Sequence, residues 1–316
     1  MRYSILCALL IASASPCAAG EGVLKQIAVL GRGTRLLALQ GLALLPDGSV
    51  LVSDKLDYRV KKLSPAGAQV ASVGGRGREP GQFQGPGPID CRGDRIAVAD
   101  HAANRIQILK GDFTPLTTLK VDGAVSDLCF DGAGNLWVAA VTMQKEKGLF
   151  QFAPDGRRLR VLPLHNAEGD MFYDAGFMAW IGGGRFAFAY FVQNRVEIWD
   201  TAGTFLGEFS VAGLPLRAPS KKVGGGSGGI QVGAPEGNIF RSIASDGRGR
   251  IYLLISDFGN QPGKEIVVVD ARGREIGRHA LPAKCVQIRA DNAGRLYAIP
   301  RERDAVITYS SVGGAR

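Results

Sequence analysis

The feature that most constrains the fold of this chain is a repeated unit of short strands and turns. Residues 87–109 contain its clearest copy, in which a strand, a glycine turn, a strand, a polar turn and a third strand follow one another. Aligning the copies on the first apolar residue of the second strand gives six anchors: Val50, Ile96, Leu136, Phe186, Ile251 and Leu296. Their spacings are 46, 40, 50, 65 and 45 residues. A period near 45 residues built only of strands and turns is typical of β-propeller blades.

The count of outer strands predicts how the repeat ends. Five units are followed by a further apolar strand, namely Val70–Gly74, Phe113–Val121, Arg158–Leu164, Phe205–Val211 and Glu275–Leu281. The sixth unit ends at Tyr309 without one, while the segment Val23–Leu30 has no partner near the N-terminus. Pairing these two ends would remove open sheet edges. The sequence therefore predicts an all-β, six-bladed β-propeller over residues 21–316, with the N-terminal strand completing the last blade.

The first 20 residues have the pattern of a secretory signal peptide. Met1-Arg2 precede an apolar run over Ile5–Ala12, and small residues follow over Ser13–Gly20. The apolar run is too short to span a bilayer, so we expect no transmembrane segment. Pro16 before Cys17 argues against lipidation. We expect a mature chain that is secreted or periplasmic.

Charge and cysteine content narrow the classes of partner. The chain has a formal net charge of +9, and loss of Arg2 with the leader leaves +8, which favours an acidic partner. Export argues against nucleic acid, so we expect an envelope or periplasmic protein. The mature chain keeps Cys91, Cys129 and Cys285, which lie in or beside apolar runs. They lack the spacing of a zinc-binding cysteine cluster, and their pairing stays open.

The second unit resembles the NHL repeat. The resemblance rests on Val98–Ile108, where Asp100 precedes Arg105 by five residues, and on Val73–Phe83, which is similar to that family's connecting segment. Asp54 and Arg59 have the same spacing in the first unit. We expect each carboxylate and guanidinium to pair across its turn. The resemblance implies a six-bladed propeller. Because the repeats are intact and the sequence shows no coherent set of catalytic residues, we expect a protein-binding scaffold or accessory subunit in the cell envelope.

One face of such a propeller carries the turns between second and third strands and the connections between blades; we call it the connection face. Loops on a rigid scaffold often carry function. We therefore expect a ligand or partner site among residues of this face: Tyr58, Arg59, His101, Arg105, His165, Arg195, Lys221 and Lys222. The alternative is that these charges only hold turns. Within residues 212–238, the basic and glycine-rich run Ser220–Gly229 predicts a flexible loop over this face.

Metal chemistry is the alternative that the sequence leaves open. Some secreted NHL-type propellers, the peptidyl-hydroxyglycine amidating lyases, hold zinc through three histidines, but His279 falls in an outer strand here. His101 and His165 with a nearby carboxylate, Asp100 or Asp170, could form a smaller site. Gluconolactonase-like propellers instead use carboxylates and amides of first strands, for which this chain offers Asp90, Asp127 and Asp131.

We assign no cofactor and no catalytic residue from sequence. A metal-dependent lyase or lactone hydrolase, with zinc or calcium at the channel mouth, is the alternative function. The oligomeric state stays open.

Overall fold

The computed structural model describes residues 20–142, 148–165, 167–168, 173–218, 220–223, 232–235, 237–257 and 261–311. The predicted signal peptide therefore lies almost wholly outside the described residues. The described part consists of strands and turns apart from one short 3₁₀ helix, η1 (His101–Ala103). No helix in these ranges is long and apolar enough to cross a membrane.

Four sheets of the structure contain four antiparallel strands each, paired in chain order. The first consists of β3 (Leu39–Leu44), β4 (Val50–Asp54), β5 (Arg59–Leu63) and β6 (Gln69–Gly74). The second consists of β7 (Pro86–Arg92), β8 (Arg95–Asp100), β9 (Arg105–Lys110) and β10 (Pro115–Lys120). The third consists of β11 (Ala124–Phe130), β12 (Leu136–Val141), β13 (Leu149–Phe152) and β14 (Arg158–Leu162). The fourth consists of β15 (Gly176–Gly182), β16 (Arg185–Tyr190), β17 (Val196–Asp200) and β18 (Phe205–Phe209).

The remaining large sheet has eight strands. Its order is β2 (Gln26–Leu30), β26 (Val306–Tyr309), β25 (Leu296–Pro300), β24 (Glu275–Ala290), β23 (Gln261–Asp270), β22 (Arg250–Asp257) and β21 (Phe240–Ser245), and β1 (Gly20–Val23) pairs with β24. The 16-residue β24 pairs with β23 mainly through its first half and with β25 through its second half. The sequence predicts a strand that ends at Leu281. Instead, the chain stays extended through Pro282 and Ala283, because no polar loop interrupts it there.

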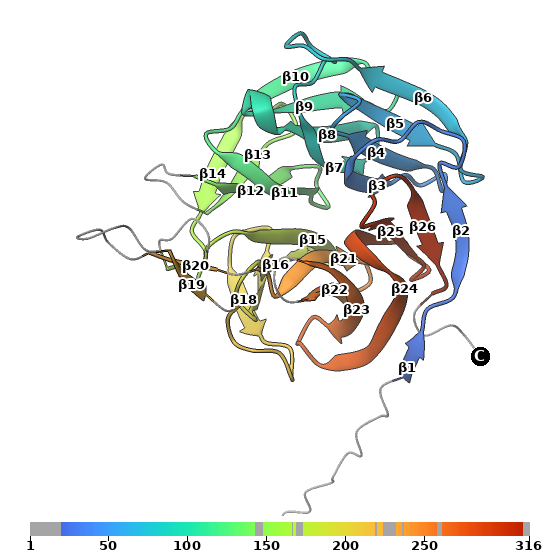
Figure 1. The fold of residues 1–316 in the computed structure, drawn as a ribbon. Coiled ribbons are helices and arrows are strands. Elements are labelled where there is room, and N and C mark those ends of the chain that lie inside the picture. The colour runs from blue at the N-terminus through green and yellow to red at the C-terminus, as the bar shows by residue number, and fades with distance from the viewer. Residues whose placement is uncertain are drawn as a thin grey trace, which may run out of the picture.

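The sheets are arranged around a common centre, as in a β-propeller (Figure 1). The first strand of each unit lies innermost, and neighbouring inner strands are in contact around the centre. These contacts run from β3 to β7, β11, β15, β21 and β24, and then from β24 back to β3. Inner strands from all parts of the chain therefore meet around one central channel.

Tight turns between first and second strands carry the glycines that the repeat predicts. Gly48, Gly134 and Gly294 have φ angles of +79°, +84° and +76°, a region that other residues enter only at a cost. In the same turns an aspartate accepts a backbone N–H two residues later, as Asp47 does from Ser49 and Asp291 does from Ala293. The predicted strand–glycine–strand unit is therefore confirmed at these turns.

The N-terminal segment differs from the single strand predicted over Val23–Leu30. It forms two strands, because the chain changes partner at Leu24 and Lys25. β1 runs parallel to the first half of β24, whereas β2 runs antiparallel to β26, with Leu30 opposite Val306. The N-terminal segment therefore pairs with strands of two neighbouring units.

The long connection before β21 differs in part from the flexible loop predicted over Ser220–Gly229, of which residues 224–229 lie outside the described residues. β19 (Ser220–Val223) and β20 (Val232–Pro235) pair as a two-stranded antiparallel sheet, so Ser220–Val223 is ordered backbone. Figure 1 places this hairpin on the outside of the ring, beside β18. β20, the strand that pairs with β19, lies beyond the glycine run, and its composition alone does not predict this pairing.

Apolar side chains between neighbouring sheets form the core. One cluster joins Ala97 and Ile106 of the second sheet to Leu128 and Val138 of the third, all fully buried. Serine hydroxyls add bonds between inner strands: Ser126 Oγ donates to the Gly176 carbonyl at 2.9 Å. Because the inner strands are fixed from both sides, the side chains that face the channel are held in place.

Candidate binding site in the central channel

The predicted pair of Asp100 and Arg105 is confirmed, with 3.1 Å between Oδ2 and Nε. Asp100 is fully buried, and its Oδ1 also accepts the backbone N–H groups of Gln84 and Gly85 at 2.9 and 2.8 Å. Arg105 donates to the carbonyls of Arg78 and Gln82 as well. The pair therefore fixes the connection between two sheets, which is a structural task.

The corresponding pair in the first unit, Asp54 with Arg59, is a wrong prediction. The buried Asp54 pairs with Lys61, whose Nζ lies 2.9 Å from Oδ2. Arg59 instead lies 3.9 Å from Asp57, with a side chain that is 41% exposed. Arg59 and Lys61 project to the same side of β5, and the buried Lys61 rather than the exposed Arg59 contacts the carboxylate.

Tyr58 and Arg195 also lie at turns of the connection face. Tyr58 adopts a left-handed backbone with φ of +56°, and the Arg76 guanidinium lies 5.7 Å from its ring centroid. Arg195 forms an ion pair with Glu208 at 3.6 Å. Lys221 and Lys222 belong to β19, and their side chains lie outside the described residues.

The two candidate histidines make separate contacts. His101 Nε2 donates to the Val125 carbonyl at 2.8 Å, and burial lowers the pKa of His101. A Cβ at Gly87 would lie 2.7 Å from the His101 ring, so the glycine gives the imidazole its space. The His165 ring stacks on Phe205 of β18, with 3.8 Å between centroids. His101 therefore contacts an inner strand, whereas His165, which follows β14 of the third sheet, contacts the outermost strand of the fourth sheet.

Metal-binding geometry is absent from the described ranges. They contain no group of three or more histidine, cysteine, aspartate or glutamate side chains placed to hold an ion. Asp170 lies outside those ranges, and His279 lies in the first half of β24, an outer-strand position as predicted. Asp131 accepts bonds from the Asn135 side chain and the Trp137 indole, so it stabilises a turn.

The three cysteines of the described chain are free thiols. Burial raises the pKa of Cys91 and Cys129, and it raises that of Cys285 to about 12. All three thiols are therefore protonated near neutral pH.

The central channel contains a cavity of about 150 Å³ that is lined by the six inner strands, β3, β7, β11, β15, β21 and β24. Its apolar wall includes Leu44, Met178 and Trp180, and its polar wall includes Asp90, Ser245 and Arg289. A concave space that combines apolar side chains with a few convergent polar groups is a feature of ligand sites, and this one is smaller than the usual range of about 300–1,000 Å³.

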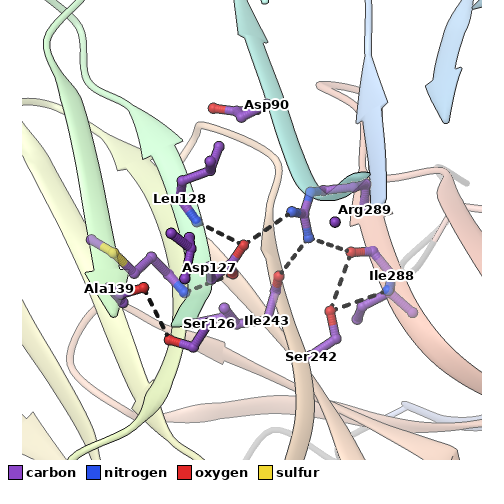
Figure 2. Close-up of polar contacts among 12 residues, drawn as sticks. Asp90, Ser126, Asp127, Leu128, Ala139, Ser242, Ile243, Ile288 and Arg289 are labelled. Atoms are coloured by element: carbon purple, nitrogen blue, oxygen red, sulfur yellow. Dashed lines mark hydrogen bonds and ion pairs between the residues drawn. The ribbon is translucent and has the colours of Figure 1, made fainter. Parts of the chain in front are cut away.

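Asp127 and Arg289 form the polar centre of this channel (Figure 2). Asp127 is 3% exposed and accepts the backbone N–H groups of Leu128 and Met178 at 2.9 and 3.0 Å. Its Oδ1 lies 3.7 Å from Nη2 of Arg289. Arg289 Nη1 lies 3.0 Å from the Ile288 carbonyl and 3.4 Å from that of Ile243. These contacts link four inner strands, β11, β15, β21 and β24.

Asp90 lies on the wall of the same cavity, on β7. Its Oδ2 accepts the backbone N–H of Phe130 from the neighbouring inner strand at 2.8 Å. Burial raises the pKa of Asp90 to about 6, against the lowering effects of the Phe130 N–H and the Arg289 charge. This carboxyl therefore changes its charge near neutral pH.

A larger open pocket of about 790 Å³ lies beside the cavity. It lies on the hairpin face, by which we mean the face with the turns between first and second strands, opposite the connection face. Leu44 and Ala290 line both spaces, so the pocket forms a vestibule to the cavity.

The vestibule is lined by charged and aromatic groups. Arg295 pairs with Asp291 at 2.6 Å, and Tyr297 lies beside them. The exposed Arg92 places its guanidinium 5.7 Å from the Trp180 ring centroid, between the vestibule and the cavity.

Sequence reasoning missed most of this site. Arg92, Trp180, Arg289 and Arg295 were not candidates, and Asp90 and Asp127 were considered only as metal ligands. The available signal was a charged residue within an otherwise apolar first strand, as at Asp127 and Arg289. Such a position predicts a group that faces the channel.

No family model matches the sequence, and the curated proteins include no match. Solved structures do match. Virginiamycin B lyase from Staphylococcus aureus, in a catalytically inactive variant with quinupristin, has a TM-score of 0.59 at 12% identity, covering 90% of this chain and 99% of that one. A gluconolactonase from Xanthomonas campestris has 0.59 at 13%, covering 87% and 86%. The WD40 β-propeller domain of Doa1 has 0.56 at 11%, covering 87% and 79%. Together with the sheet arrangement, these likenesses show that the chain has a β-propeller fold.

Proposed function

We propose that the chain is an exported, six-bladed NHL-type propeller that works as a binding scaffold or accessory subunit in the cell envelope. Six blades follow if the eight-stranded sheet is divided at β24, with β2 as the outermost strand of the last blade. The Asp100–Arg105 pair supports the NHL assignment. The leader sequence supports export.

The observation that carries the binding role is the open vestibule on the hairpin face. It offers guanidinium groups, a tyrosine and backbone turns within about 790 Å³. Arginine and tyrosine are enriched at protein interfaces because they combine large contact area with directional hydrogen bonds. A rigid propeller that presents this mixture is suited to receive a segment of another protein.

Charge favours an acidic segment as the occupant. Two arginines, Arg92 and Arg295, line the vestibule against one carboxylate, Asp291. Since Asp291 is paired with Arg295, the charge of Arg92 is left in excess. The net positive charge of the whole chain would attract the same partner at longer range. We therefore propose an acidic segment of an envelope or periplasmic protein.

A charge-reversal experiment tests the proposal and distinguishes the two faces. Wild-type protein, Arg92→Glu on the hairpin face and Arg59→Glu on the connection face are each recovered from the native compartment after mild crosslinking. Both arginines are partly exposed, so each variant should keep the wild-type melting temperature. We expect a partner with wild type and Arg59→Glu, and at least a fivefold smaller yield with Arg92→Glu.

The opposite pattern would place the partner-binding site on the connection face. If only Arg59→Glu loses the partner, then the residues predicted from sequence, with Tyr58 and Arg105 among them, form the interface. If wild type recovers no partner above a control without crosslinker, the scaffold proposal fails.

A lyase or lactone hydrolase is the second candidate, and one group of the cavity favours it. The Asp90 carboxyl, with a pKa of about 6, could transfer a proton near neutral pH. Opening of a simple lactone, measured with and without added zinc or calcium, tests this function. Activity that Asp90→Asn abolishes would support it, and no activity under any of these conditions would reject it.

A further inference from the structure

We infer that the central cavity is a binding site for the primary ammonium group of a small organic amine. The inference goes beyond the proposed partner binding and does not depend on it, because the cavity lies inside the channel, behind the vestibule. Three observations carry it: the balance of charges in the cavity wall, the position of Asp90, and the apolar surface around it.

The charge balance leaves one carboxylate without a cation. Asp90 and Arg289 line the cavity, and Asp127 lies 3.7 Å from the Arg289 guanidinium. Arg289 is directed toward Asp127 and the carbonyls of Ile243 and Ile288, as Figure 2 shows. Within the described ranges, Asp90 accepts backbone N–H groups, of Phe130 and Cys91, and forms no ion pair, while the Arg289 charge acts on it at longer range. An ionised carboxylate in such surroundings gains from a bound cation.

The cavity wall favours an ammonium over a metal ion. Calcium requires six to eight oxygen ligands and magnesium a nearly octahedral set, whereas one carboxylate and one hydroxyl, from Asp90 and Ser245, line this space. An ammonium needs only a few acceptors, and the alkyl chain behind it can pack on apolar surface. Leu44, Met178 and Trp180 supply that surface.

Access from the vestibule sets the orientation of the ligand. Because Leu44 and Ala290 line both spaces, an amine can reach the cavity from the hairpin face and place its ammonium group at Asp90. Its chain would then point outward past Arg92. A volume of about 150 Å³ suits a short chain better than a large ring system.

The test is a titration of purified mature protein with n-butylammonium chloride at pH 7.5, followed by calorimetry. We expect saturable binding by wild type and at least tenfold weaker binding by Asp90→Asn, whose side-chain oxygen can still accept the Phe130 N–H. The uncharged n-butanol should not bind measurably. Asp291→Asn, which removes a vestibule carboxylate, is the matched control and should bind like wild type.

Acidification gives a second readout that needs no variant. The groups that act on the Asp90 carboxyl are Arg289, Asp127 and Cys91. With a pKa of about 6, the carboxylate fraction falls roughly tenfold between pH 7.5 and pH 5, so wild-type affinity should fall roughly tenfold. This readout keeps the inference testable even if Asp90→Asn does not fold.

Several results would overturn the inference. Equal binding of n-butanol would show an apolar pocket without charge recognition. An equal loss of affinity for n-butylammonium in Asp291→Asn and Asp90→Asn would place the amine in the vestibule. Absence of wild-type binding at pH 7.5, or affinity that does not change at pH 5, would reject the site. None of these outcomes bears on partner capture, which the Arg92→Glu experiment tests separately.

Discussion

Replacing Arg289 with methionine should destabilise the protein strongly at neutral pH and much less in mild acid. The Arg289 side chain lies in the channel, 3.7 Å from the buried Asp127. Methionine keeps much of the side-chain volume but removes the charge. Asp127 would then retain two backbone N–H donors, from Leu128 and Met178, and lose its cation. Breaking a buried ion pair by removing one partner typically costs about 3–5 kcal/mol.

Proton uptake by Asp127 limits this cost. Burial already raises the pKa of Asp127 in the folded protein, and loss of the guanidinium would raise it further. A group with a raised folded pKa destabilises the fold above its unfolded pKa, and the penalty fades as the pH falls toward that value. With an unfolded pKa near 3.9 and about 1.4 kcal/mol per pH unit, the largest penalty is about 4 kcal/mol at pH 7 and about 1.5 kcal/mol at pH 5.

Urea unfolding of wild type and Arg289→Met at both pH values measures the effect. We expect the difference in unfolding free energy to shrink by roughly 2 kcal/mol or more between pH 7 and pH 5. The double variant Arg289→Met with Asp127→Asn should recover part of the loss at pH 7. A difference that is the same at both pH values would refute the reasoning, because it would show that lost packing, and not the Asp127 charge, causes the effect.

Three further predictions concern the scaffold. Asp100→Ala should lower the free energy of unfolding, measured in urea, by about 3–5 kcal/mol, because it leaves two backbone N–H groups and the Arg105 guanidinium without their acceptor. Arg59→Ala removes an exposed ion pair and should change this free energy by less than about 1 kcal/mol. Equal losses of stability in the two variants would contradict this prediction. Gly74→Ala should lower the melting temperature clearly, since φ is +128° and a Cβ would collide with the Tyr58 carbonyl; an unchanged melting temperature would show that the backbone can adjust. The buried thiols of Cys129 and Cys285 should react slowly with a thiol reagent at pH 8 and rapidly in urea, because burial raises their pKa values; fast labelling of these two thiols in the folded protein would disprove their burial.

Local patterns predict the units of this fold well. Val50 and Leu296 each begin a second strand where their apolar residue follows a glycine turn, because turn and strand preferences act over a few residues. The continuity of β24 and the break at Leu24 could not be predicted in this way. Both depend on which strand lies alongside, and alternation of apolar residues does not specify the partner.

The candidate site shows the same limit more strongly. Arg289 and Asp127 are 162 residues apart in sequence and meet only because the ring brings their strands together. The motif that is easiest to recognise, Asp100 with Arg105, holds a connection in place. His101, a candidate ligand-binding residue by sequence, donates to the Val125 carbonyl. Polar residues of repeats are therefore as often part of the scaffold as of the site.

Site-specific photocrosslinking tests the central claim, that the hairpin face is the binding face. A photoreactive amino acid replaces Asn292, an exposed residue that lines the vestibule, or Tyr58 on the connection face, and each protein is irradiated in its native compartment. We predict a discrete crosslinked partner from position 292 and none above background from position 58. A partner captured from position 58 alone would contradict the account.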